Sequence, residues 1–359
     1  MEKIKVIVGL SGGIDSSISA VLLKEKGYDV VGVFMEIFDE RDKKFLDFKN
    51  ACYGPEEKDI EDIEKICKIL NIPFHIIDLK KEYKKIVLQY FKDEYLKGRT
   101  PNPCVVCNRF LKFDMLLKKV FSLGINFNYF ATGHYARVEY DKRRGRYILK
   151  KGIDTEKDQS YFLFLLTQEQ LSKIIFPLGN YTKEMVRKIA KDYGLPLLDK
   201  KESQDFISGD RFFLFEKNRK EGFIVDKNGN ILGKHKGIIY YTIGQRRGLG
   251  ISTGKPLYVV EINGEENKIV VGEENDLYKK GLIVENVNFV SIERLKKEMK
   301  VEVKIRYKHS PAKAIIRPID ESRVEVIFEK NQKAPTPGQA AVFYIKDKLI
   351  GGGFISSVF

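Results

Sequence analysis

The stretch that decides the fold is Gly9-Leu10-Ser11-Gly12-Gly13-Ile14-Asp15-Ser16-Ser17. It follows a short apolar run, residues 5–10, and precedes a segment whose apolar residues recur at helical spacing. Glycines let the backbone turn sharply and bring its N–H groups against an anion. A helix that starts at the same point adds its positive N-terminal end. The loop is therefore predicted to cradle the phosphates of a nucleotide.

The same loop differs from a Walker A loop, because the Gly-Lys-Ser/Thr ending is missing. Asp15 stands where a lysine would otherwise assist. A carboxylate beside phosphates needs a cation, so we expect Mg²⁺ to bridge Asp15 and the nucleotide.

Strand and helix patterns alternate through the first half of the chain. Apolar strand-like runs occur at residues 30–34, 74–79 and 129–132, and helical patterns at 59–70 and 113–121. Alternation of this kind predicts the α/β class, a doubly wound parallel sheet with helices on both faces.

After about residue 214 the sequence pattern changes to short strand-like segments separated by turn-forming residues. Six such pieces are expected at residues 284–290, 300–307, 314–318, 323–328, 339–345 and 348–355. Six short strands with turns between them predict a small C-terminal β-barrel. We place the domains at residues 1–213, 214–280 and 281–359.

Composition bounds the kind of protein. The 359 residues carry a net charge of +14, which favours a polyanionic partner, although a Lys- and Glu-rich surface is also typical of thermophiles. No apolar run approaches the ~18 residues of a membrane span. The N-terminus lacks the pattern of a secretory signal, so a cytoplasmic protein without a membrane partner is expected.

Four cysteines occur, and two of them lie in Gly98-Arg-Thr-Pro-Asn-Pro-Cys-Val-Val-Cys-Asn108. The prolines stiffen the backbone before Cys104, as suits a reactive thiolate at Cys104 or Cys107. Arg99 and Arg109 are expected to lower the thiol pKa. The alternative, half of a structural zinc site, would need two further ligands that the sequence does not offer nearby.

The phosphate loop resembles that of the N-type ATP pyrophosphatases. That resemblance implies that ATP is cleaved to AMP and pyrophosphate while a carbonyl oxygen of the substrate becomes adenylated. It also implies an adenine site at Met35, which ends the second strand, and at Gly133, which ends a later one.

Taken as a whole, the chain is similar to the bacterial tRNA-uridine 2-sulfurtransferase (tRNA-specific 2-thiouridylase) family. The matching motifs lie at residues 9–16, 100–108, 131–135, 157–161, 201–205, 241–250, 306–307 and 337–339. The resemblance implies a pyrophosphatase catalytic domain, a small central domain and a barrel that contacts tRNA. It implies an enzyme that uses ATP to replace the C2 oxygen of the wobble uridine by sulfur.

The family resemblance also assigns residues and partners. Cys107 is the implied nucleophile, and Cys104 is our own candidate for its catalytic companion. The implied tRNA contacts are Asn102, Pro103, Cys104, His134, Lys157, Asp158, Gln159, Arg306, Tyr307 and Gln339. The implied substrates are tRNAs that read Lys, Glu and Gln codons, and the implied sulfur source is a cysteine desulfurase or a sulfur carrier.

One departure from the family pattern affects the sulfur chemistry. The family has a second cysteine where this chain has Ile207. In one scheme Cys107 and Cys104 form the persulfide and resolving pair. In the other, Cys104, Cys107 and a third ligand hold a 4Fe–4S cluster that carries sulfide. The sequence favours the cluster slightly, with Cys52 preferred over Asp205 as third ligand.

Cys67 and two rival functions complete the predictions. Cys67 lies within a helical apolar pattern and is expected in the core.

Two other functions are alternatives to tRNA thiolation. A lysidine synthetase-like ligase would not need Cys104 or Cys107. A non-catalytic, metal-stabilised RNA-binding protein would release no pyrophosphate.

Overall fold

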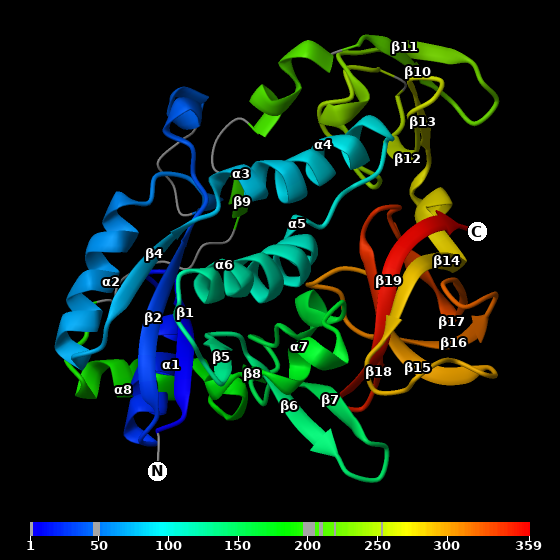
Figure 1. Cartoon of the computed structure of the whole chain (residues 1–359). Coiled ribbons are helices and arrows are strands. Elements are labelled where there is room, and N and C mark those ends of the chain that lie inside the picture. Colours follow the sequence, from blue (N-terminus) through cyan, green and yellow to red (C-terminus); the bar gives the residue numbers. More distant parts are fainter. Residues whose placement is uncertain (1–2, 46–50, 197–204, 208–210, 219, 253) are drawn as a thin grey trace. The chain divides into compact units, whose positions relative to one another are not determined.

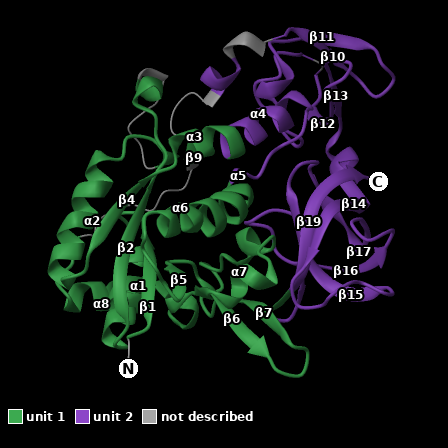
Figure 2. Cartoon of the chain, in the orientation of Figure 1, with its two compact units in different colours: residues 1–86, 104–211, 347–349 green, residues 87–103, 212–346, 350–359 purple. Residues whose placement is uncertain are grey.

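The computed structural model describes residues 3–45, 51–196, 205–207, 211–218, 220–252 and 254–359 (Figure 1). Two compact units make up the chain (Figure 2). The first contains residues 1–86, 104–211 and 347–349, and the second contains 87–103, 212–346 and 350–359. Within the described residues, no helix has both the length and the apolar character needed to span a membrane.

The first unit is built on a five-stranded parallel sheet in the order β4-β2-β1-β5-β8. Its strands are β1 (Lys5–Leu10), β2 (Asp29–Glu36), β4 (Phe74–Asp78), β5 (Tyr129–Thr132) and β8 (Ile174–Ile175). The central strand β1 buries Val6, Ile7 and Val8 completely. A strand covered on both faces reads as a continuous apolar run, which is why the sequence revealed it.

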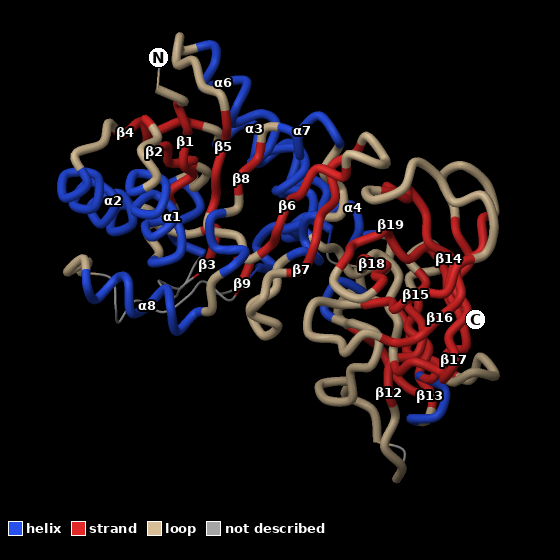
Figure 3. Tube along the Cα trace, turned by 90° about the horizontal axis from the view of Figure 1, so that it is seen from below, coloured by secondary structure: helices blue, strands red, loops and turns tan. Residues whose placement is uncertain are grey.

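Helices cover both faces of this sheet, as predicted. The main ones are α1 (Ile14–Glu25), α2 (Glu57–Leu70), α6 (Leu116–Ser122) and α8 (Lys183–Asp192). α1, α2 and α8 lie on one face and α6 lies on the other (Figures 1 and 3). Cys67 of α2 is buried in the apolar core beneath α1, which confirms its predicted place.

Shorter elements connect these helices and strands. They are η1 (Glu40–Phe45), β3 (Ala51–Tyr53), α3 (Lys80–Tyr83), η2 (Lys84–Leu88), α4 (Gln89–Leu96), α5 (Pro103–Val106), η3 (Cys107–Met115), β6 (Ala136–Asp141), β7 (Arg146–Lys151), η4 (Ser160–Leu163), α7 (Gln168–Ser172), η5 (Pro177–Asn180) and β9 (Asp205–Ile207). η3 is a π-helix between α5 and α6, so the predicted helix at 113–121 is the second half of a longer helical run.

The second unit contains two all-β parts. The first is a four-stranded sheet of β11 (Ile231–His235), β10 (Gly222–Val225), β13 (Lys268–Gly272) and β12 (Tyr258–Asn263). Short 3₁₀ turns flank it: η6 (Arg211–Asn218), η7 (Ile238–Tyr240) and η8 (Glu274–Leu277). Residues 87–103 also belong to this unit, although they lie within the first predicted domain.

The second part is the predicted six-stranded barrel. Its strands are β14 (Tyr278–Phe289), β17 (Val324–Lys333), β16 (Ala312–Pro318), β15 (Met299–Lys304), β18 (Ala340–Ile345) and β19 (Lys348–Val358). Pairing of β14 with β19 closes the barrel. Closure leaves no free strand edge and encloses an apolar core that includes Phe328 and Phe343.

Candidate active site

The chain reverses its winding direction at β1. The strand pairs with β2 on one side and with β5 on the other, and Gly9 lies opposite both Val33 and Thr132. In parallel α/β sheets, ligands bind beyond the carboxyl ends of the strands at such a point. Met35 and Gly133, at the ends of β2 and β5, therefore lie along the same sheet edge as the phosphate loop.

The phosphate loop has the geometry of an anion site. Gly12 adopts a positive φ of 69°, which the turn into α1 requires. The Ser16 hydroxyl accepts from Ser11 N–H at 3.1 Å and donates to the Gly13 carbonyl at 3.0 Å. The Ser17 hydroxyl also donates to that carbonyl, at 3.1 Å. Gly13 offers no side chain to cap α1, so the helix presents its first N–H groups to a ligand.

Gly133 presses against the first turn of α1. A Cβ on this residue would lie 2.8 Å from the carbonyl carbon of Asp15 and from the amide nitrogen of Ser16. Only glycine permits so close an approach of two backbone segments. The strand end at Gly133 and the phosphate loop are thus parts of one surface.

Asp15 is held by two side chains that sequence analysis missed. Its Oδ1 accepts from the Tyr135 hydroxyl at 2.7 Å, and Lys183 Nζ lies 2.8 Å from both Oδ1 and Oδ2. The positive charge that we assigned to Mg²⁺ is supplied here by Lys183. The only sequence signal was a lysine at the first position of a helix, directly after the capping residue Thr182.

The two motif cysteines lie on consecutive helical segments. Cys104 is in α5 and Cys107 begins η3, and both are partly buried. Burial raises the pKa of Cys104 to about 12 and the pKa of Cys107 to about 11. Both groups are therefore neutral thiols near pH 7 in this state.

Cys52 belongs to the same cluster of thiols. Burial is the main cause of the raised pKa of Cys104 and of Cys107, and the charge of Cys52 raises both pKa values further. The three sulfur atoms are therefore close enough to interact electrostatically. Tyr83, which is fully buried, has a pKa raised first by burial and then by all three cysteines. The Cys52 side chain itself is exposed. The structure therefore unites Cys52 with the Cys-x-x-Cys motif.

Lys112 supplies the positive charge beside these thiols. Backbone bonds in a π-helix run from i to i+5, so Lys112 lies about one turn beyond Cys107 on the same face of η3. The Lys112 ammonium opposes the burial that raises the pKa of Cys104 and Cys107. In the part of the chain that the structure describes, Lys112 forms no ion pair.

This finding corrects the prediction that Arg99 and Arg109 act on the thiols. Arg99 is paired with Glu94 at 2.8 Å and with Glu285 at 2.9 Å. Arg109 stacks over the ring of Phe110 at 5.1 Å. Lys112 was not predicted from the sequence, because the helical pattern was placed only from residue 113, whereas a π-helix already runs over Cys107–Met115.

A short chain of contacts joins the thiol helix to the phosphate loop. Phe113 of η3 packs against the His134 ring, with centroids 5.9 Å apart. His134 follows Gly133, which contacts the backbone of Asp15. Burial, and then the Lys112 charge, lowers the pKa of His134 well below its usual value, so its ring is neutral. Both halves of the predicted chemistry therefore belong to the same surface of the first unit.

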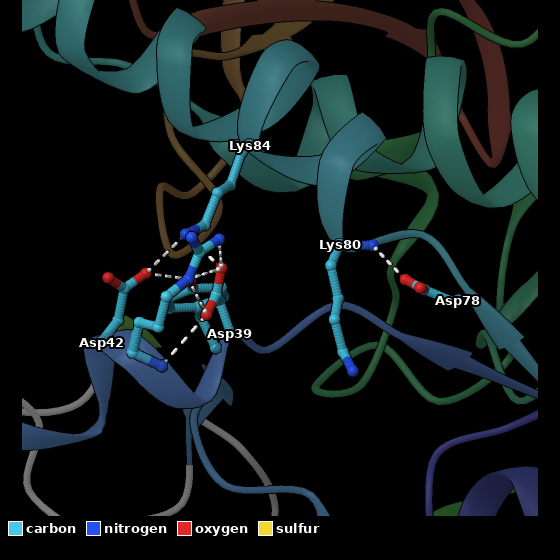
Figure 4. A network of polar contacts seen from close by, with 7 residues as sticks. Asp39, Asp42, Asp78, Lys80 and Lys84 are labelled. Atoms are coloured by element: carbon cyan, nitrogen blue, oxygen red, sulfur yellow. Dashed lines mark hydrogen bonds and ion pairs between the residues drawn. The ribbon is translucent and has the colours of Figure 1, made fainter.

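A network of ion pairs secures the strand that carries Cys52 (Figure 4). Lys84 Nζ lies 2.7 Å from Asp39 Oδ2 and 3.2 Å from Asp42 Oδ2. The Tyr53 hydroxyl donates to Asp42 at 2.6 Å, and its ring stacks on Tyr83 at 5.3 Å. Because Tyr53 adjoins Cys52 in β3, the network fixes the position of this thiol.

Three family models match the chain in order. One described as "tRNA methyl transferase HUP domain" covers residues 4–208, more than half of the chain. "tRNA methyl transferase PRC-barrel domain" covers 211–273, and "Aminomethyltransferase beta-barrel domain" covers 279–355.

Full-length relatives give the sharper result. The tRNA-specific 2-thiouridylase MnmA of Acetivibrio thermocellus is 47% identical over 362 residues, which cover 99% of this chain and 100% of the relative. The tRNA-specific 2-thiouridylase MnmA 1 of Caldanaerobacter subterraneus subsp. tengcongensis is 51% identical over 358 residues, 98% and 97% of the two chains. The chain belongs to the tRNA-specific 2-thiouridylase family.

Among solved structures, a 4-thiouridine synthetase–RNA complex with bound ATP has a TM-score of 0.35 at 18% identity. It covers 58% of this 2-thiouridylase and 45% of the synthetase chain.

Ile207, which we predicted at the position of the second family cysteine, lies on β9, and β9 pairs with β3 through Tyr53 opposite Ile207. The strand β9 is thus a neighbour of the strand that carries Cys52. Residues 201–204 of the Lys201–Asp205 motif lie outside the described residues, as does the side chain of Asp205.

The tRNA contacts predicted within the first unit form an ordered loop. Gln159 exchanges two hydrogen bonds with the Tyr135 backbone, at 2.9 and 3.0 Å, and so holds the loop beside His134. Asp158 is buried and accepts from Gly152 N–H and from the N–H and hydroxyl of Ser160. Its carboxylate organises the loop, so a contact with tRNA stays a prediction for this position.

The tRNA contacts predicted within the second unit fall into two groups. Asn102 is buried, and its N–H donates to the Tyr90 hydroxyl at 3.2 Å. Gln339 donates to the carbonyls of Thr100 and Pro101, at 3.1 and 2.9 Å, and thereby positions the segment that leads to Pro103.

Arg306 and Tyr307 lie at the end of β15. Arg306 is exposed, whereas Tyr307 is half-buried with Lys304 Nζ 5.4 Å from its ring centroid. An exposed guanidinium beside an aromatic ring is a suitable surface for a phosphate and an unpaired base.

Proposed function

We propose that this chain catalyses the ATP-dependent 2-thiolation of uridine in tRNA. The observation that carries the proposal is its membership, along the full length, of the tRNA-specific 2-thiouridylase family. The site agrees with that chemistry, because one unit combines a phosphate loop with three neighbouring thiols.

The first half-reaction activates the base. ATP would bind with its phosphates on the loop from Gly9 to Ser17 and its adenine between Met35 and Gly133. The uridine O2 attacks the α-phosphorus as N3 gives up its proton, and pyrophosphate leaves. The product is a uridine whose O2 carries AMP. Converting oxygen into AMP supplies a leaving group that uracil lacks.

The second half-reaction transfers sulfur. The terminal sulfur of a persulfide on Cys107 attacks C2, the C2–O bond breaks, and AMP departs. A second thiol, that of Cys104 or Cys52, then attacks the Cys107 sulfur and forms a disulfide. The transferred sulfur keeps the electron pair of the broken S–S bond and remains on C2, while N3 recovers a proton. An external dithiol would reduce the disulfide and reset the enzyme.

Lys112 is assigned to the charge that accompanies this step. The attacking persulfide and the departing AMP are both anions, and the ammonium lies on the face of η3 that bears Cys107. A positive charge held in place needs no reorganisation when the anion forms.

A 4Fe–4S cluster on Cys52, Cys104 and Cys107 was the sulfur carrier favoured from sequence. Among the described residues, the structure shows no group of three Cys, His, Asp or Glu side chains already arranged as metal ligands. We write the transfer with a persulfide because neighbouring thiols can carry out every bond change in it, and the cluster is the alternative that iron analysis decides. Iron and sulfide analysis of anaerobically purified wild type and Cys52→Ala tests the choice. Stoichiometric iron in wild type that is lost in the variant would favour the cluster scheme over the persulfide scheme.

Mg²⁺ fits the phosphate site, because Asp15 offers a carboxylate at the loop. When bound there, the ion would screen the charge of the transferred phosphates. The remaining assignments follow the family resemblance. The substrates would be tRNAs that read Lys, Glu and Gln codons, the donor a cysteine desulfurase or sulfur carrier, and the location the cytoplasm, where ATP and tRNA meet.

Mass spectrometry of nucleosides tests the proposed function. Unmodified tRNA is incubated with enzyme, ATP, Mg²⁺, cysteine and a cysteine desulfurase that delivers persulfide sulfur to Cys107, and 2-thiouridine is expected only when ATP is present. A lysidine synthetase-like ligase would instead retain its activity in Cys107→Ser. A non-catalytic RNA-binding protein would release no tRNA-dependent pyrophosphate. Either result would refute the proposal.

A further inference from the structure

The ammonium group of Lys183 lies where its positive charge is electrostatically unfavourable. It is the first residue of α8, where the positive end of the helix dipole repels an ammonium group. Its side chain is only 9% exposed, and burying a charge is unfavourable unless the charge is paired. Two neighbours fix the backbone here, since Lys183 N–H donates to Asp154 at 2.9 Å and Thr182 caps the helix. The fold therefore holds this ammonium against an electrostatic penalty.

The partner of Lys183 explains where the ammonium points. Both Asp15 oxygens lie 2.8 Å from Nζ, and Asp15 stands in the first turn of α1, within the phosphate loop. α1 and α8 pack against each other within the first unit (Figure 1). The ammonium thus ends at the side chain of a residue in the first turn of α1, the turn whose N–H groups are expected to bind phosphate. A Walker A loop places its lysine at such a position from within the loop itself.

The Asp15 carboxylate cannot pair with Lys183 and bind a metal ion through the same oxygens at the same time. Lys183 contacts both of its oxygens, and the Tyr135 hydroxyl donates to Oδ1 at 2.7 Å. A nucleotide brings several negative charges to the loop, and a metal that accompanies it would need a carboxylate oxygen. Lys183 can satisfy both demands by turning from Asp15 to the phosphates, since a lysine stem has four rotatable bonds and its ammonium is a point charge.

We propose that Lys183 is an exchangeable cation of the nucleotide site. Without nucleotide, it neutralises Asp15 and occupies the place of a metal ion. With nucleotide, it leaves the carboxylate and binds the pyrophosphate portion of ATP, which frees Asp15 to hold the metal. The inference rests on the proposed use of ATP, and it adds a residue and an order of events that the loop motif does not contain.

Nucleotide binding to the full-length protein tests the first half of the exchange. Titration calorimetry with ATP·Mg²⁺ and with AMP compares wild type, Lys183→Met, Lys183→Arg and the control Lys188→Met, an exposed lysine on the same helix. Loss of one charged contact predicts about 10- to 100-fold weaker ATP binding in Lys183→Met. AMP binding should change far less, Lys183→Arg should recover part of the affinity, and Lys188→Met should match wild type.

A double variant separates contact with phosphate from simple neutralisation of Asp15. If Lys183 only balanced the carboxylate, Asp15→Asn with Lys183→Met would restore ATP affinity to that of Asp15→Asn alone. We expect no such restoration. Equal ATP affinity in Lys183→Met and wild type, or full restoration in the double variant, would overturn the inference. Failure of wild type itself to bind ATP would instead refute the proposed function.

Metal binding in the absence of nucleotide tests the second half of the exchange, in which Asp15 becomes a metal ligand once Lys183 has left it. Mn²⁺ is a paramagnetic probe whose free and bound forms are distinguished by electron paramagnetic resonance. Wild type should bind no Mn²⁺ at this site, because Lys183 occupies Asp15. Lys183→Met should bind one Mn²⁺ per chain, and the double variant should lose it. Absence of that ion in Lys183→Met would show that Asp15 is not a metal ligand. Thermal unfolding of each variant verifies that it is folded.

Discussion

Replacing Glu56 by Gln should stabilise the protein in a pH-dependent way. Glu56 is 8% exposed, and its Oε1 accepts from the N–H groups of Ile37 and Phe38, at 3.0 and 3.3 Å. These two residues follow β2, next to the expected adenine site at Met35. Burial raises the Glu56 pKa from 4.5 to about 7, despite the two hydrogen bonds. The carboxylate thus costs free energy at neutral pH.

The sign and size follow from linkage. Below pH 4.5 the group is protonated in both the folded and unfolded states and contributes nothing. Between pH 4.5 and about 7 the unfolded chain releases the proton first, so the free energy of unfolding falls as pH rises. At about 1.4 kcal/mol for each pKa unit, the full loss is roughly 3 kcal/mol above pH 7. Glu56→Gln keeps an oxygen acceptor and removes this loss.

Urea unfolding followed by circular dichroism between pH 4 and 8.5 measures the effect. The stability gained by Glu56→Gln should be near zero at pH 4 and approach its maximum near pH 8. Glu57→Gln is the neighbouring control, because Glu57 is exposed and forms an ion pair with Lys43, at 3.2 Å. Its pKa is lowered, chiefly by a backbone hydrogen bond, so this control should give no gain that grows with pH. Glu56→Ala should be less stable than Glu56→Gln by about 1–3 kcal/mol, since two buried N–H groups lose their acceptor. A gain that did not vary with pH would refute the reasoning.

Three further changes test the site. Gly133→Ala should weaken ATP binding by roughly 10-fold or more, because its Cβ would lie 2.8 Å from the backbone of Asp15; calorimetry measures this, and unchanged affinity would contradict the described contact. Cys107→Ser should lower thiolation by roughly 1,000-fold or more while ATP binding persists, as nucleoside mass spectrometry and calorimetry would show. Gln339→Leu should destabilise the second unit by about 1–2 kcal/mol through loss of its bonds to Thr100 and Pro101, which urea unfolding would detect.

Local features of the sequence were sufficient for the sheet, the barrel and the phosphate loop. Apolar runs and helical spacing identify the strands and helices because each pattern reflects a face that must be buried. The loop after β1 is likewise local, since its glycines, serines and first helical turn are consecutive. The family motifs also identified the two thiols at Cys104 and Cys107, which are three residues apart.

Spacing could not have revealed the partners that complete the site. Lys183 is 168 residues from Asp15, so spacing gave no sign of the pair. Cys52 was named from the sequence as a candidate ligand, but its place beside the other thiols depends on β3 and the Tyr53–Asp42–Lys84 contacts. The positions of Lys112 and Cys107 on one face depend on a π-helix, which hydrophobic periodicity does not distinguish from an α-helix. The sequence alone therefore determined the elements and the anion-binding loop. Tertiary packing decided which charges and thiols surround them, because long-range contacts are selected by the whole core and not by neighbouring residues.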